Sequence, residues 1–133
     1  MTPVVLEVRQ TWDGHPIKTT ERATICFHAN DTHLVVEVEA PFHDDPTHAD
    51  PAGSLWKLWE WEVVELFVAT TSETYTEIEL GPHGHYLLLT LKGERHIVSH
   101  GHRIHYEVER HGGRWQAVQD GEVSIDIAVI AAP

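Results

Sequence analysis

Residues 75–89 read YTEIELGPHGHYLLL, and this stretch decides the fold class. Thr76, Ile78 and Leu80 alternate with polar residues, and leucines recur at every second position over 87–91. The segment between the two patterns, 81–84, is a Gly-Pro-His-Gly turn signal. Alternation on both sides of a short turn predicts two antiparallel strands that share one buried face.

The same alternation recurs along the chain. The alternating segments are 4–8, 23–27, 34–38, 64–68, 76–80, 87–91, 104–108 and 123–129, with two shorter ones at 95–99 and 114–118. Turn signals occur at 29–32, 81–84, 92–94, 111–113 and 119–121. Because no segment keeps a helical period over ten residues, the prediction is an all-β fold. It is a single antiparallel β-sandwich domain over residues 1–133, with about nine strands and little helix.

One long connection, residues 41–60, interrupts this rhythm. It is rich in Asp, His, Pro and Gly, and one helical turn is expected around 54–58. Long connections in compact domains are uncommon and often functional. The chain then becomes aromatic and acidic over 55–67, LWKLWEWEVVELF.

Composition excludes several classes of protein. The chain has 133 residues and a formal charge of −12 with its 12 histidines neutral. This acidic, histidine-rich chain has no basic stripe, so neither nucleic acid nor an anionic membrane surface is an expected partner. It has no apolar run of transmembrane length and no signal-peptide pattern. With one cysteine, Cys26, it cannot form an intramolecular disulfide, and a cytoplasmic location is expected.

The segments LWEWEVVELFV (58–68) and YTEIELGPHGHYLLL (75–89), with a later strand at Trp115, resemble a family of small uncharacterised proteins. The fold of that family is the DOMON-like, jelly-roll β-sandwich of the family 9 carbohydrate-binding modules. The resemblance covers about 32–129. In those modules it implies a sugar held between aromatic rings, polar side chains on its hydroxyls, and a structural calcium. No activity follows from the uncharacterised branch.

The end of the chain departs from that pattern. Members of the family continue into at least one further strand, whereas this chain stops at Ala131-Ala132-Pro133. An open sheet edge is therefore expected there, and open edges pair with other strands. A homodimer is the resulting expectation.

The candidate ligand site is the aromatic and acidic segment together with the strand after it. Three of the five tryptophans fall within six residues, and one glutamate interrupts an otherwise apolar strand. Aromatic rings supply apolar contact area, and carboxylates accept hydroxyl hydrogen bonds. Trp59 and Trp61 share a face if their segment is a strand. The expected ligand-binding residues are Trp56, Trp59, Trp61, Glu65, Tyr75, Glu77 and Glu79. The alternative without a ligand is that these tryptophans are core residues and that these glutamates are solvent-exposed or structural.

Metal sites are weaker candidates. His83 and His85 form a His-Gly-His pair, as do His100 and His102, and imidazole is a common ligand for zinc. The acidic residues of the long connection, Asp44, Asp45 and Asp50, suit calcium. Surface histidines in an acidic protein are the favoured explanation of the pairs. Ca²⁺ and Zn²⁺ are therefore the candidate cofactors, with no firm ligand set.

Two function classes follow, and the balance favours the first. One is a non-catalytic module that binds a small polar ligand, a saccharide first. The other is an enzyme that uses Glu65 or the Glu77/Glu79 pair, with or without a bound metal. The two carboxylates of that pair are about 6–7 Å apart if only strand rise separates them, within the range of glycosidase pairs. An aromatic protein-interaction surface is a third reading.

Overall fold

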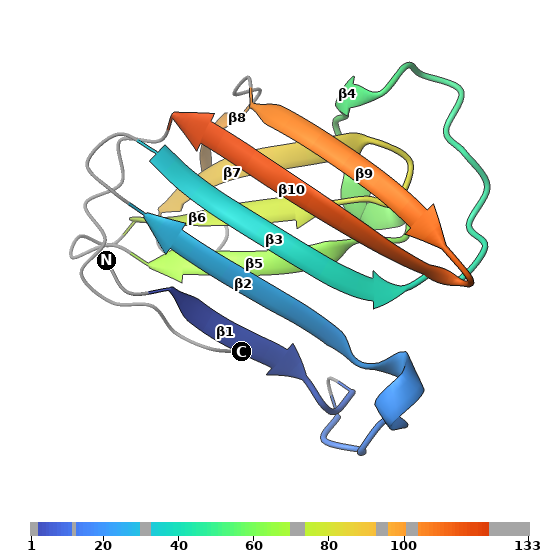
Figure 1. Ribbon diagram of the computed structural model, residues 1–133. Helices are drawn as coiled ribbons and strands as arrows, with labels where there is room; N and C mark the ends of the chain where they lie inside the picture. The colour runs from blue at the N-terminus through green and yellow to red at the C-terminus, as the bar shows by residue number, and fades with distance from the viewer. Residues whose placement is uncertain are drawn as a thin grey trace.

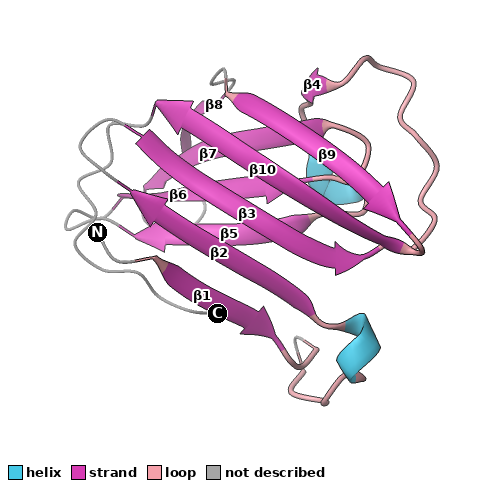
Figure 2. Cartoon of the chain, viewed as in Figure 1, coloured by secondary structure: helices cyan, strands magenta, loops and turns pink. Residues whose placement is uncertain are grey.

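The computed structural model describes residues 3–11, 13–29, 33–69, 74–92, 96–100 and 104–122, and its regular structure is almost entirely strands (Figures 1 and 2). The strands are β1 (Val4–Val8), β2 (Ala23–Ala29), β3 (His33–Pro41), β4 (Gly53–Ser54), β5 (Val64–Ala69), β6 (Thr74–Leu80), β7 (His85–Lys92), β8 (His96–His100), β9 (His105–His111) and β10 (Arg114–Glu122). Two single-turn 3₁₀ helices, η1 (Thr19–Glu21) and η2 (Leu58–Glu60), are the only helices in these ranges. None of the described helices is long and apolar enough to span a membrane.

The strands form two sheets, which Figure 1 shows lying one in front of the other. The first has the order β1-β2-β3-β10-β9, and the second has the order β4-β7-β6-β5 with β8 also on β7. Every pairing between these strands is antiparallel except that of β4 with β7. The prediction of an all-β fold is therefore confirmed.

The two sheets enclose one hydrophobic core. Alternate residues of β2 and β3, such as Phe27 and Val36, are fully buried, and they cluster with Leu66 of β5 and Ile78 of β6 from the other sheet. Trp115 of β10 belongs to the same cluster. The period-2 pattern is thus the pattern of one face of each sheet packed on the other, as in a β-sandwich.

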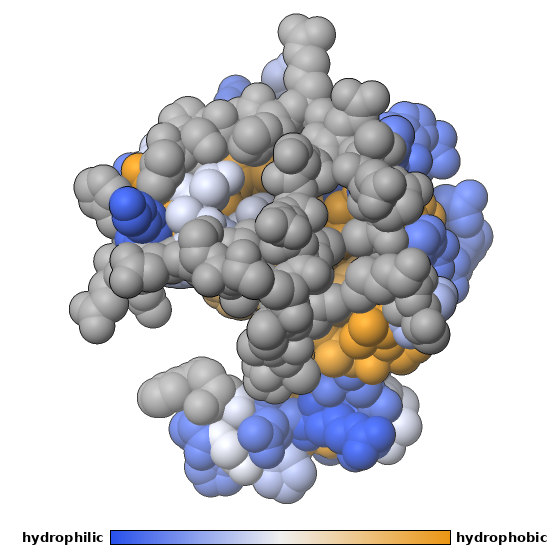
Figure 3. Space-filling model, turned by 90° about the vertical axis from the view of Figure 1, so that its left-hand side faces the viewer, coloured by the Kyte–Doolittle hydropathy of each residue, from blue (hydrophilic) through white to orange (hydrophobic). Residues whose placement is uncertain are grey.

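Apolar surface also remains outside this core. Figure 3 turns the side where the N-terminus lies toward the viewer, and its described residues include an apolar area bordered by strongly hydrophilic ones. Val5 and Val8 of β1 are among the exposed large apolar side chains. Exposed apolar side chains are ordinary in soluble proteins, so they do not by themselves mark a binding site.

Two local predictions need correction, and one short strand was missed. The turn predicted at 119–121 is wrong, because β10 runs through it and pairs with β3 and β9 on both sides, with Gln119 fully buried. The helical turn expected around 54–58 lies later, at η2, because Ser54 pairs with β7. The short β4 was not predicted.

Of the other predicted turns and strands, some are confirmed and some fall on residues that the structure does not describe. The turns at 81–84 and 111–113 are confirmed, and the shorter segments at 95–99 and 114–118 correspond to β8 and β10. The predicted strand at 123–129 lies outside the described residues, as do most of the turns at 29–32 and 92–94.

Candidate functional site

The candidate site lies on the outer face of the second sheet, away from the shared core. On β5, Leu66 and Val68 point into the core, so Glu65 and Phe67 point outward. On β6, Ile78 and Leu80 point inward, so Tyr75, Glu77 and Glu79 share the outer face. The register places Glu65 opposite Glu79 and Phe67 opposite Glu77. Residues distant in sequence thereby become neighbours.

The end of the long connection folds over part of this face. Leu55 and Leu58 pack on the outward leucines of β7, and together they form a second, smaller apolar cluster. The Leu55 N–H donates to the Tyr86 carbonyl at 3.0 Å, which ties the segment to β7. Lys57 adopts a left-handed conformation, with φ of 64°, and reverses the chain before η2. Part of the outer face is therefore buried.

Beside this covered area, the outer face is hollowed into an open groove of about 330 Å³. The groove is lined by aromatic, aliphatic and acidic side chains: Trp59, Glu65, Phe67, Tyr75, Glu77, Leu89, Leu91 and Ile97. Its volume matches the lower end of small-ligand sites, and mostly apolar walls with a few polar groups are their usual composition.

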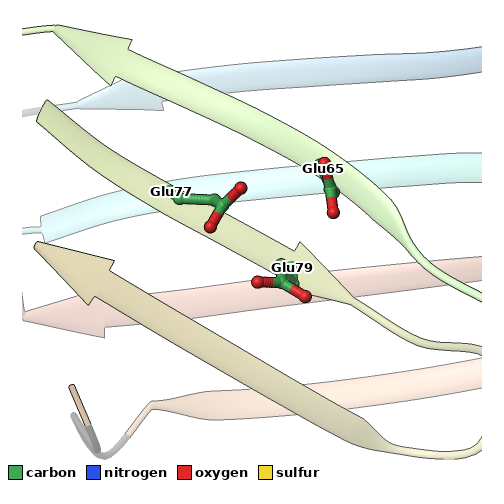
Figure 4. A group of neighbouring side chains, drawn as sticks. All are labelled: Glu65, Glu77 and Glu79. Carbon is green, nitrogen blue, oxygen red and sulfur yellow. The ribbon is translucent and has the colours of Figure 1, made fainter. Parts of the chain in front are cut away.

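Three carboxyl groups lie close together beside this groove, and Figure 4 shows them as neighbours. Glu65 comes from β5, and Glu77 and Glu79 come from β6. One oxygen from each carboxyl lies within 4.8 Å of the other two. This is closer than the 6–7 Å estimated from strand rise, because the side chains lean toward one another. It is the one group of three or more His, Cys, Asp or Glu side chains with such spacing in the described ranges.

Glu79 is the most unusual of the three. Its side chain is fully buried, and neither carboxyl oxygen accepts a hydrogen bond from a protein N–H or O–H. Burial raises the pKa of Glu79 to about 8, and the negative charges of Glu77 and Glu65 add to the shift. At neutral pH the Glu79 carboxyl therefore holds its proton, which it can share with Glu77.

The tryptophans do not act as one group. Trp59 lines the groove and is 40% exposed, and its ring meets that of Trp56 edge to face at 5.2 Å. Trp61 instead packs against the second apolar cluster and the His48 ring, at 4.9 Å. The expectation that Trp59 and Trp61 share a strand face is wrong, because η2 and an irregular segment precede β5. Trp59 is therefore the groove tryptophan.

The histidine and aspartate candidates for a metal site are occupied in fixing the long connection. His83 Nε2 lies 2.8 Å from the Asp45 carbonyl, and His85 Nε2 lies 2.9 Å from the Asp50 carbonyl. The Asp45 carboxylate accepts the Glu62 N–H at 2.6 Å. These contacts join the connection to the β6–β7 turn, to the start of β7 and to the segment before β5.

The predicted metal ligands that the structure describes do not form a cluster. Within the described ranges, His83, His85, Asp44 and Asp45 do not bring three ligand atoms together. Of the second histidine pair, His102 lies outside the described residues. Hydrogen bonding to the long connection is therefore the role that the structure gives to His83, His85 and Asp45.

Two other hollows are less suited to a ligand. The one beside Trp61, His48 and His85 has a volume of about 10 Å³, room for about one water molecule. A larger one, of about 310 Å³, has Trp115 and Glu65 in its wall. The Trp115 Nε1–H in that wall is buried without a partner. This second hollow has one of the three clustered carboxylates, whereas the groove has two at its surface.

Sequence reasoning missed four residues of the groove: Phe67, Leu89, Leu91 and Ile97. The signal for Phe67 was present, because it lies two residues after Glu65 and therefore on the same face. The leucines of β7 gave no such signal, because a strand buried in a core and a strand that lines a groove show the same alternation of apolar residues.

Comparison with known proteins gives sequence relatives. The chain is 35% identical over 113 residues to the rat UPF0462 protein C4orf33 homolog, covering 83% of this chain and 56% of that protein. It is 33% identical over 113 residues to the human UPF0462 protein C4orf33, with the same coverage. The zebrafish homolog is 38% identical over 90 residues, which are 65% of this chain and 45% of that protein. The chain thus spans about half the length of these relatives. No family model matches the chain, and no solved structure does so.

Proposed function

We propose that the protein is a non-catalytic β-sandwich that binds a small polar ligand in the groove over β5–β7, with a saccharide as the first candidate. The observation that supports this most is the half-exposed Trp59 in a groove that carboxyl groups also line. Trp59 and Tyr75 offer flat apolar faces for sugar C–H groups, and Glu65 and Glu77 offer acceptors for hydroxyls. We include in this proposal the DOMON-like type of β-sandwich that the sequence resemblance implies.

The test is a ligand screen with mono- and disaccharides, read by tryptophan fluorescence and by thermal shift. We expect Trp59→Ala to weaken a hit about tenfold or more, since a central aromatic contact contributes about 2 kcal/mol or more. Trp56→Ala is the matched variant, because Trp56 is equally exposed but contacts Trp59 instead of lining the groove. Its effect should be smaller. Equal binding by parent and folded Trp59→Ala would place the site elsewhere.

A carboxylate enzyme is the second candidate, and one observation favours it. Glu79 is protonated at neutral pH beside two further carboxyl groups, and a pair of carboxyls in different protonation states is the usual acid–base arrangement of glycosidases. Against this, Glu79 is fully buried and does not line the groove, so a substrate in the groove does not reach it. Turnover of aryl glycosides that Glu79→Gln abolishes would favour the enzyme.

Location and partners belong to the same proposal. We place the protein in the cytoplasm because its one cysteine suits a reducing compartment, and subcellular fractionation tests this. Neither nucleic acid nor anionic membrane is proposed as a partner, given the charge of −12. The homodimer stays a prediction for light scattering. If no saccharide binds, the exposed Trp56, Phe67 and Ile97 make a protein-interaction surface the next candidate.

A further inference from the structure

The Glu65, Glu77 and Glu79 cluster has the dimensions of a cation site. Calcium binds protein oxygens at about 2.4 Å, so two of its ligands are at most about 4.8 Å apart. One oxygen from each of the three carboxyls meets that limit with the other two. Two adjacent strands supply these groups, and the register of β5 on β6 fixes their relative positions.

Glu79 gives an independent reason to expect a ligand. Its carboxyl group is fully buried, and neither oxygen accepts a hydrogen bond from a group outside the cluster. Buried polar atoms in folded proteins almost always have a partner, and an exception calls for a missing ion or water molecule. One oxygen of Glu79 lies within 4.8 Å of an oxygen of Glu65 and of Glu77, its neighbours in Figure 4. At least one unsatisfied oxygen of Glu79 therefore belongs to the cluster.

The donor set indicates which ions fit. All three groups are carboxylates, and no histidine or cysteine of the described ranges belongs to the cluster. Carboxylate oxygens are hard ligands that suit Ca²⁺, Mg²⁺ and Mn²⁺, whereas zinc sites are usually built with nitrogen or sulfur. Glu65 and Glu77 also line the open groove, which leaves room for water molecules on the remaining coordination positions.

We propose that Glu65, Glu77 and Glu79 bind one hard divalent cation, Ca²⁺ or the similar Mn²⁺, beside the groove, where Glu65 and Glu77 line it. This site is distinct from the aspartates and histidines that the sequence singled out. It does not depend on the saccharide proposal, because the three protein ligands are positioned without one.

The test is isothermal titration of the EDTA-treated full chain with CaCl₂ and, separately, MnCl₂, with no saccharide present, at pH 8. We expect one ion per chain and a rise in melting temperature that EDTA reverses. Glu79→Gln and Glu77→Gln should each weaken binding about tenfold or more, because calcium affinity depends on the number of charged ligands. Glu37→Gln is the matched control, since it removes one exposed carboxylate from β3 in the other sheet and leaves the cluster intact.

A single cation site that is lost in Glu79→Gln and Glu77→Gln but kept in Glu37→Gln supports the proposal. No heat and no thermal shift with either ion up to about 10 mM, beyond the weakest protein calcium sites, overturns it. Parent-like affinity in Glu77→Gln, shown folded by circular dichroism, also overturns it. So does binding of Zn²⁺ without Ca²⁺ or Mn²⁺. Since saccharide binding is measured in a separate titration, either proposal can fail alone.

Discussion

Replacing Glu79 with glutamine tests the electrostatics of the site through the pH dependence of folding. The pKa of Glu79 is about 8 in the folded protein, against 4.5 for an ordinary glutamate. Between these values the folded chain holds a proton that the unfolded chain releases. The stabilisation from this proton is fully present below about pH 4.5 and is lost as the pH rises through about 8. Glutamine cannot ionise, so Glu79→Gln should not show this loss.

The magnitude follows from the size of the pKa shift. Each pH unit in the affected range changes the free energy of unfolding by about 1.4 kcal/mol, so the two units from pH 6 to pH 8 give about 3 kcal/mol at most. Glu65 and Glu77, the neighbours of Glu79 in the cluster, line the open groove, so screening by nearby water reduces this value by about half. Relative to the parent, Glu79→Gln should therefore gain about 1–2 kcal/mol of stability between pH 6 and pH 8.

Urea unfolding in EDTA, followed by tryptophan fluorescence at both pH values, measures this difference. Glu37→Gln serves as the control, because its exposed carboxyl lies on the other sheet, and its difference from the parent should stay constant. The histidines are shared by parent and variants, so their contribution cancels in the comparison. A Glu79→Gln difference that is constant with pH within about 0.5 kcal/mol, the usual agreement of such measurements, would refute the reasoning.

Three further predictions concern the rest of the molecule. Gly84→Ala should destabilise the fold by about 1–3 kcal/mol in urea unfolding. Gly84 has φ of +94°, and a Cβ there would lie 2.9 Å from the Cβ of Ala52. Parent-like stability would contradict this prediction. His85→Phe keeps a ring but loses the contact with the Asp50 carbonyl. It should lower the free energy of unfolding by about 1 kcal/mol and make limited proteolysis of the 42–52 segment faster. An unchanged digestion pattern would show that other contacts are enough to hold this segment. Solubility should pass through a minimum near the isoelectric point of about 5.3, where self-repulsion vanishes, and a flat solubility curve from pH 8 to pH 5 would indicate buried or shifted histidines.

The fold was predictable because the alternation records burial directly. Ile25 and Phe27 of β2 and Ile78 and Leu80 of β6 are buried at every second position, as expected from their pattern. The prediction at 119–121 failed because a Gln-Asp-Gly sequence also fits a central strand. There Gln119 is buried with its Nε2 toward the Leu34 carbonyl, a tertiary contact that turn propensity does not register.

The candidate site was predictable only in part. Period-2 alternation placed Glu65 on one face of its strand and Glu77 with Glu79 on one face of theirs. It could not bring the two strands together, because the pairing of Glu65 with Glu79 depends on register across the hairpin. The shared face of Trp59 and Trp61 failed because the chain turns at η2, and local sequence does not reveal that this segment packs on β7.

Packing alone gives no reason for the acidic cluster. The cross-strand neighbours of Glu79 and Glu77 on β7 are Leu87 and Leu89, and both leucines are buried on the same outer face. A leucine at position 79 would therefore face an apolar neighbour and would avoid the cost of burying a carboxyl group without a partner. Three acidic groups at this point lower the stability of the chain at neutral pH unless a proton or a cation compensates their charge. The facing positions on β7 are leucines, whereas β6 has glutamates here, and the proposed cation site would account for this difference.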